Sequence, residues 1–144
     1  MRLGSLMLTA CLFSVIHAEA QDHVAPIHIE KLTETTSAWD GTPYNSYPSG
    51  PPQISILRFT IPPHTTMKWH THLVPNAGYV ISGEITIEKL DGTKKHVAAG
   101  QAVAETVNNI HRGITGESTA VLIVFYAGAI DLPLSQDAHP EVEH

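Results

Sequence analysis

The chain has 144 residues, 42% of them hydrophobic, and a formal net charge of -6 from 8 basic and 14 acidic side chains. This length predicts one domain, and the apolar fraction is sufficient for a buried core, which excludes wholesale disorder. The basic residues are scattered along the chain. Their distribution argues against nucleic acid or an anionic membrane surface as the main partner.

Residues 1–20 have the features of a secretory signal peptide. Arg2 supplies the positive charge that precedes an apolar stretch over residues 3–16, which is too short to span a bilayer. Ala18 and Ala20 then match the small-residue pattern of a cleavage site. Cleavage after Ala20 predicts a periplasmic or secreted protein without a membrane span.

Two alternatives to cleavage remain open at this end of the chain. The first is a retained membrane anchor. The second is a lipoprotein, because Leu8-Thr9-Ala10-Cys11 resembles a lipobox whose cysteine carries lipid. Cys11 is also the single cysteine of the sequence, so the mature protein would have no thiol, disulfide or cysteine metal ligand.

The mature chain divides into an N-terminal arm and loop (21–52), a β-rich region (53–130) and a polar C-terminal tail (131–144). In the arm, Ile27-His28-Ile29 is a candidate short strand, and Trp39-Asp40-Gly41 is either a clamp over the domain or an ordinary capping turn. Alternating or β-branched segments separated by turn residues predict an all-β sandwich or barrel. The expected strands are 53–61, 77–81, 84–88, 95–97, 101–107, 111–115 and 120–126.

Three histidines form a candidate metal site. His70 and His72 are two residues apart in a β context, so their imidazoles project from the same face of a strand. His111 follows a later strand and turn, and beside the first pair it completes a three-imidazole site. Such a site suits one divalent transition metal, namely Fe, Mn, Ni, Cu or Zn.

The spacing of these histidines resembles that of the cupin superfamily. His70 and His72 with Gly83 resemble the first signature motif, and Gly100 with His111 resembles the second. The resemblance covers residues 53–128. It implies a single conical β-barrel, or jelly roll, with ligands bound inside beside a metal. It also implies that small members pair as homodimers.

This chain departs from the family motifs at several positions. His64 stands where the first motif opens with glycine, and Asn108 stands at a glycine position of the second motif. Asn76 stands where the first motif has its glutamate ligand, and an amide oxygen is a weak neutral ligand. Glu105 lies six residues before His111 in an otherwise apolar strand. It either points into the barrel, as the replacement ligand or an acid/base group, or faces solvent, because strand parity alone does not fix the face.

Two aromatic residues, Trp69 and Tyr79, are candidates for lining a substrate pocket, with ordinary core packing as the alternative. The family resemblance implies a metal-binding protein that handles a small organic molecule. It allows an enzyme with oxygenase-type or isomerase-like chemistry, and equally a non-enzymatic module that binds a small molecule or metal.

Overall fold

The computed structural model describes residues 25–140. Within this range it contains nine β-strands and no helix. The strands are β1 (Pro52–Ile61), β2 (His70–Thr71), β3 (Asn76–Ser82), β4 (Glu84–Lys89), β5 (Lys94–Ala98), β6 (Ala102–Ala104), β7 (His111–Thr115), β8 (Ala120–Ala129) and β9 (Gln136–Asp137). The all-β prediction is therefore confirmed.

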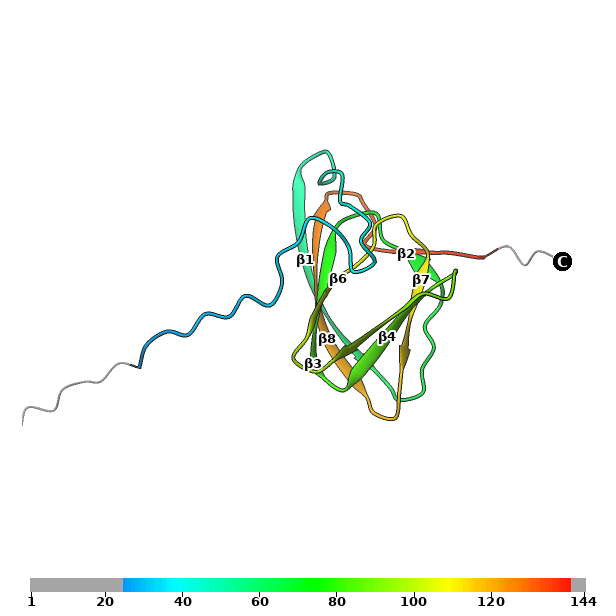
Figure 1. Ribbon diagram of the computed structural model, residues 1–144. Helices are drawn as coiled ribbons and strands as arrows, with labels where there is room; N and C mark the ends of the chain where they lie inside the picture. Colours follow the sequence, from blue (N-terminus) through cyan, green and yellow to red (C-terminus); the bar gives the residue numbers. More distant parts are fainter. Residues whose placement is uncertain (1–24, 141–144) are drawn as a thin grey trace, which may run out of the picture.

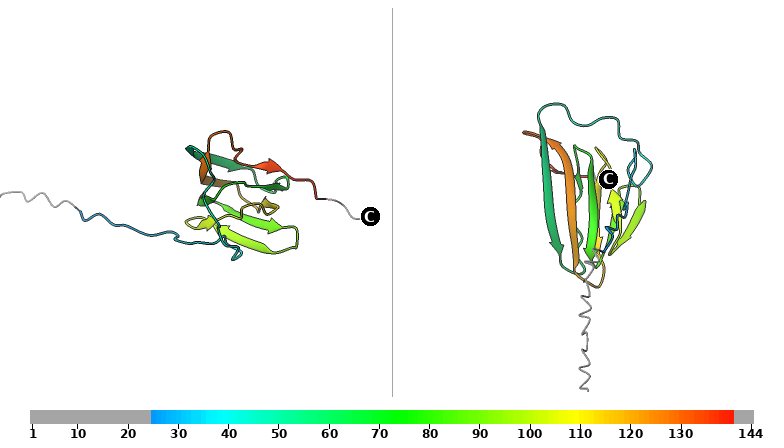
Figure 2. Two further views of the ribbon diagram at one scale, coloured as in Figure 1. Left: turned by 90° about the horizontal axis from the view of Figure 1, so that it is seen from above. Right: turned by 90° about the vertical axis from the view of Figure 1, so that its left-hand side faces the viewer.

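The strands form two antiparallel sheets that face each other as two layers (Figures 1 and 2). One sheet has the order β1-β8-β3-β6, and the other has the order β5-β4-β7-β2-β9. Strands that are consecutive in the chain often lie in different sheets, as β6 and β7 do. This arrangement is the predicted jelly roll, and it brings β2 and β7 together as neighbours.

The hydrophobic core lies between the two sheets. Burial alternates along β3, β7 and β8, as expected when one face of a strand is covered and the other is not. The inward-facing aliphatic side chains of both sheets form one cluster, which includes Val80, Ile85, Ile87, Leu122 and Val124. With no disulfide expected, apolar packing and strand pairing account for the stability.

Two positions occupied by glycine in the cupin motifs keep a glycine-like backbone here. His64 and Asn108 have φ angles of 53° and 55°. This left-handed region strains most side chains, although asparagine and histidine enter it more often than others. The turn geometry of the motifs is therefore retained after the glycines themselves have been replaced.

The N-terminal arm contains no regular strand in its described part. Residues 25–32 run away from the barrel, and the predicted strand at Ile27-His28-Ile29 is absent (Figure 1). Residues 37–44, which we call the clamp, turn back and pack on the barrel. This segment is built around a turn at Trp39-Asp40, and it corresponds to the clamp that the sequence left as one of two alternatives.

The segment after residue 130 differs from the predicted polar tail. Leu132 and Leu134 pack against the core, and β9 pairs with β2 at the edge of the five-stranded sheet. The prediction missed this because polar residues surround the two leucines. As a result, this segment borders the histidine cluster.

The predicted signal peptide, with Cys11 and the cleavage site after Ala20, lies outside the described residues. The last residues of the predicted tail, 141–144, also lie outside them. Within residues 25–140, no helix is long and apolar enough to cross a membrane.

Candidate metal centre

The three predicted histidines meet inside the barrel. His70 on β2 is directly opposite His111 on β7, and His72 follows one alternation later on the same face. One nitrogen atom from each imidazole lies within 4.8 Å of the other two. His72 and His111 are almost completely buried, whereas His70 is half-buried toward the opening of the cavity.

Backbone carbonyls orient all three imidazoles in the same way. The Nδ1 atoms of His70, His72 and His111 lie 2.8–2.9 Å from the carbonyl oxygens of Lys68, Leu134 and Asn109. A carbonyl oxygen only accepts, so each Nδ1 carries the proton and donates it. The Nε2 atoms are thereby directed to the cluster, as is typical of metal-ligating histidines.

Glu105 lies beside this cluster. Its Oε2 atom is 2.8 Å from Nε2 of His72 and 3.7 Å from Nε2 of His111. Burial alone would raise the pKa of Glu105, but contacts with His111 and His72 outweigh it and hold the pKa well below its usual range. The carboxyl group is therefore ionised and faces the histidines, although Glu105 directly follows β6, a strand of the opposite sheet.

The same pair of contacts acts on the histidines. Burial alone would lower the pKa of His72, but the hydrogen bond and charge of Glu105 raise it above its usual value. Burial is the largest effect on His70, and the pKa of that group is lowered. His70 is therefore neutral near pH 7, the form in which imidazole binds metal ions.

Asn76 occupies the motif position of the usual glutamate but has a different environment. It is buried at the start of β3, its Nδ2 donates weakly to the carbonyl of Val74, and its Oδ1 has no hydrogen-bond partner. Its backbone carbonyl accepts from the N–H of Glu105. Asn76 lines a second cavity, and it is not among the residues that line the cavity with the histidines.

A cavity of about 360 Å³ extends from the histidines into the barrel. Most of its walls are apolar, and its polar groups gather at the histidine cluster and at the opening, where Lys68, Ser135 and Asp137 lie. This combination fits a small molecule that has an apolar body and a polar end at the histidines. The apolar lining residues are Phe59, Ile61, Met67, Ile85, Ile87, Gly113, Leu122 and Val124.

Tyr126 is a cavity residue that the sequence analysis missed. It lies on β8, buried, with its ring 5.6 Å from the ring of His72. Burial and the charge of Glu105 raise the pKa of Tyr126 well above its usual value, so the phenol keeps its proton. A tyrosine in an apolar strand resembles a core residue, and only the pairing of β8 with Asn76 on β3 would have placed it.

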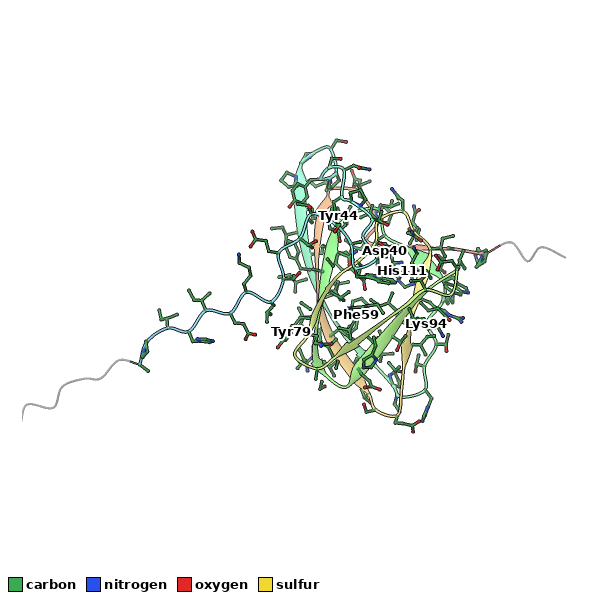
Figure 3. The ribbon with its side chains drawn as sticks, in the orientation of Figure 1. Asp40, Tyr44, Phe59, Tyr79, Lys94 and His111 are labelled. Atoms are coloured by element: carbon green, nitrogen blue, oxygen red, sulfur yellow. The ribbon has the colours of Figure 1, made fainter. Side chains whose placement is uncertain are left out.

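Trp69 and Tyr79 do not line the cavity. Trp69 precedes His70 and therefore projects from the opposite face, where the guanidinium of Arg112 lies 4.2 Å from its ring. Tyr79 alternates with the buried Gly78 and Val80, so it faces outward (Figure 3). Their prediction as pocket residues is corrected by strand alternation.

The residues present fit a transition-metal ion. Three imidazoles and one carboxylate are a common donor set for such metals. Within residues 25–140, the buried Nε2 atom of His111 has no hydrogen-bond partner, which is costly in a protein interior unless another group binds it. His70, His72 and His111 are therefore positioned to hold a metal ion, with Glu105 adjacent.

Comparisons with known proteins agree with this geometry. A family model described as a cupin domain matches residues 57–126, which contain all three histidines and Glu105. No curated protein sequence gives a significant match. The region matched by the family model, residues 57–126, is the one that carries the two motifs.

Solved structures with the same fold include two enzymes. The polyketide cyclase RemF from Streptomyces resistomycificus is 20% identical, with a TM-score of 0.52 over 62% of this chain and 63% of that one. The DMSP lyase DddQ from Ruegeria pomeroyi DSS-3 is 16% identical, with a TM-score of 0.52 over 72% of this chain and 49% of that one. The match thus spans less than two thirds of each of these proteins, and it establishes the fold. From the family match, the jelly-roll topology and the histidine cluster together, this chain belongs to the cupin superfamily.

Proposed function

We propose that this protein is a periplasmic or secreted cupin that binds one divalent transition metal and acts on a small organic molecule by oxygenase-type chemistry. The convergence of three carbonyl-oriented imidazoles carries this proposal. His70, His72 and His111 hold the metal, which is Fe, Mn, Ni, Cu or Zn. When bound, such an ion supplies Lewis-acid or one-electron redox chemistry at its open coordination positions.

The other cavity residues have separate roles in this proposal. Glu105 is either the fourth ligand, in place of the family's glutamate, or the group that accepts a proton from the substrate. Tyr126 donates a hydrogen bond or a proton to the polar end of the substrate. The apolar walls bind the body of the substrate and exclude water.

Oxygen consumption by the metal-loaded protein tests the catalytic part of the proposal. The cavity favours a substrate with an apolar body and one oxygen-bearing end, so the panel contains small phenols, diketones and flavonoid-like compounds. Turnover of one class, lost in Tyr126→Phe or Glu105→Gln, is the expected result. Metal binding without oxygen uptake or product across the panel would contradict it.

A non-enzymatic module that binds a small molecule or metal is the second candidate function. The replacement of the motif glutamate by Asn76 favours it, because this change removes a charged ligand from its usual position. A ligand that binds the metal-loaded protein and is recovered unchanged would support the binding module. The two candidates differ only in whether the bound molecule is converted.

Glu105→Gln should weaken metal binding at least about 10-fold, because it removes the only carboxylate that contacts the histidines in the described part of the chain. Glutamine keeps the size of the side chain, so the barrel should remain folded. Isothermal titration with Zn²⁺ or Co²⁺ measures the effect. Glu117→Gln is the matched control because Glu117 is exposed on a turn, and equal affinities in both variants would return Glu105 to a structural role.

We also propose that the protein is a homodimer. The outer face of the four-stranded sheet exposes Ile54, Ile56 and Phe125 by 69%, 64% and 41%, and Ile56 pairs directly with Phe125. β1 is an edge strand of this sheet. A second copy of the same face would cover the apolar patch and protect the edge.

Replacing Ile56 with aspartate should convert the dimer into a monomer, because it places a charge in the patch without touching the core. Sedimentation equilibrium measures the mass directly. Ile130→Asp is a suitable control, since Ile130 is 53% exposed but follows the end of β8. A wild-type protein that sediments as a monomer at micromolar concentration would refute the dimer.

A further inference from the structure

The backbone of Glu105 lies outside the regular hydrogen bonding of the sheet. β6 ends at Ala104, and a bend with Asn108 in the left-handed region follows shortly afterwards. The N–H of Glu105 still donates to the carbonyl of Asn76. After Glu105, β6 does not continue, so no strand pairing holds the carbonyl of this residue. The direction of the Glu105 side chain therefore depends on the group that binds this carbonyl.

Tyr44 of the N-terminal clamp binds that carbonyl. Its hydroxyl lies 2.6 Å from the carbonyl oxygen of Glu105, and it is the donor because a carbonyl only accepts. One residue earlier, the N–H of Trp39 donates to the carbonyl of Ala104 at 2.9 Å. The clamp therefore binds the backbone carbonyls of two consecutive residues, Ala104 and Glu105. The second of these residues carries the carboxylate that faces the histidines.

The clamp is internally braced, so it can hold a position. Within it, the N–H groups of Ala38 and Gly41 donate to the carbonyls of Thr42 and Ala38, and the Asp40 carboxylate accepts from the N–H of Thr42. Ser37 forms a β-bridge with Pro43. These contacts turn a Gly- and Pro-containing loop into a compact unit.

The clamp is also attached to the opposite sheet. Asp40 forms an ion pair with Lys89 at 2.8 Å, and both side chains are largely buried. Lys89 at the end of β4 is the register partner of His111. In Figure 3, Asp40 and Tyr44 lie at the same end of the barrel as His111. The clamp therefore connects the segment that follows β6 with β4, the strand beside His111.

We propose that Tyr44 is a positioning residue, and that through it the clamp fixes the Glu105 carboxylate beside His72 and His111. The hydroxyl holds the peptide group that follows the Cα atom of Glu105, and so restricts the rotation that would carry the carboxylate away from the histidines. Tyr44 and the other described clamp residues do not line the cavity that contains the histidines. The role of the positioned carboxylate, as a metal ligand or an acid/base group, rests on the proposed function.

Tyr44→Phe tests the inference because it removes only the hydroxyl group. In titrations with Co²⁺, we expect the affinity to fall about 10-fold, as is common when a partner of a ligand is removed. The visible absorption spectrum of the Co²⁺ protein should shift toward that of Glu105→Gln. In the double variant, loss of the hydroxyl should add little to the loss already caused by Glu105→Gln, because both act through one group.

Tyr47→Phe is the matched control, since Tyr47 lies in the loop just after the clamp and is 76% exposed. It should leave both the affinity and the spectrum unchanged. If Tyr44→Phe lowers only the thermal stability and leaves affinity and spectrum as in the wild type, Tyr44 is merely structural and the inference is overturned.

Failure of the proposed function gives a different pattern. If the wild-type protein binds no Co²⁺, metal binding is refuted, and the inference is then decided from imidazole ¹⁵N resonances of the unloaded protein. Tyr44→Phe should shift the His72 resonances in the same direction as Glu105→Gln does, because both changes weaken the contact between Glu105 and His72. Unchanged His72 resonances in Tyr44→Phe would overturn the inference.

Discussion

Replacement of His111 by alanine is expected to reduce the affinity for divalent transition metals by at least about 1,000-fold, equivalent to about 4 kcal/mol. His111 is 2% exposed, and its Nε2 atom has no other partner in the described structure. The variant removes one of three imidazole donors and leaves the remaining two unable to surround the ion. Isothermal titration with Zn²⁺, Mn²⁺ or Ni²⁺ measures the loss.

Two further variants separate loss of the ligand from loss of the fold. His70→Ala should have a similar effect on metal affinity with less disturbance of packing, because His70 is only half-buried. His64→Ala is the matched control, since His64 lies on an exposed turn near Glu117 and away from the cluster. Retention of wild-type affinity in both His70→Ala and His111→Ala would place the metal elsewhere.

Replacement of Gly83 by alanine is expected to lower the free energy of unfolding by about 4 kcal/mol. Gly83 connects β3 and β4 with a φ angle of +72°, and a Cβ atom there would lie 2.3 Å from the carbonyl oxygen of Thr119. The three atoms nearest to this Cβ position all belong to the backbone of Thr119 and Ala120, so they do not move cheaply. Urea denaturation of the variant measures the loss.

Gly92→Ala provides the matched comparison. Gly92 has a similar φ of +82°, but no atom lies within 4 Å of the position of its Cβ. The free energy of unfolding of Gly92→Ala should therefore fall only by the cost of the left-handed backbone, about 1 kcal/mol. Equal losses at Gly83 and Gly92 would mean that the strands adjust around Gly83, and that its place in the cupin motif reflects backbone angle alone.

The strand pattern could be predicted from sequence because alternation and turn residues are local signals. β3, β4 and β7 begin and end within about two residues of the expected segments, the usual uncertainty of element boundaries. The short strands β2 and β9 were not expected. A strand of two residues has too little periodicity to be recognised, and the pairing of β2 and β9 depends on segments that are distant in the sequence.

The histidine cluster was predictable for a related reason. His70 and His72 share a face by alternation alone, and the cupin spacing supplied the third position. The face of Glu105 could not be derived from its own strand, because a register shift of one residue reverses every side chain. The pairing of β6 with β3, where Ala104 lies opposite Ala77 and the N–H of Glu105 donates to Asn76, brings the Glu105 backbone to the cavity. The direction of its side chain then depends on the clamp residue that binds its carbonyl.

The sequence left the clamp as one of two alternatives, and the contact between Tyr44 and Glu105 could not be predicted from it. Tyr44 lies 61 residues before Glu105, in a segment rich in Gly, Pro, Ser and Asn that predicts only loops. Trp69 is the opposite case, because the sequence already contained the signal that corrects it. A residue adjacent to an inward-facing histidine on a strand projects outward.

Elemental analysis of the native protein, purified without chelator or affinity tag, tests the central claim most directly. A metal centre built from His70, His72, His111 and Glu105 predicts close to one equivalent of a single transition metal per chain, and loss of that metal in His111→Ala. Saturating metal at about 100 times its dissociation constant should also stabilise the fold by about 2.7 kcal/mol. A native protein that carries no transition metal, and whose thermal unfolding does not respond to added Fe²⁺, Mn²⁺, Ni²⁺, Cu²⁺ or Zn²⁺, would contradict the claim.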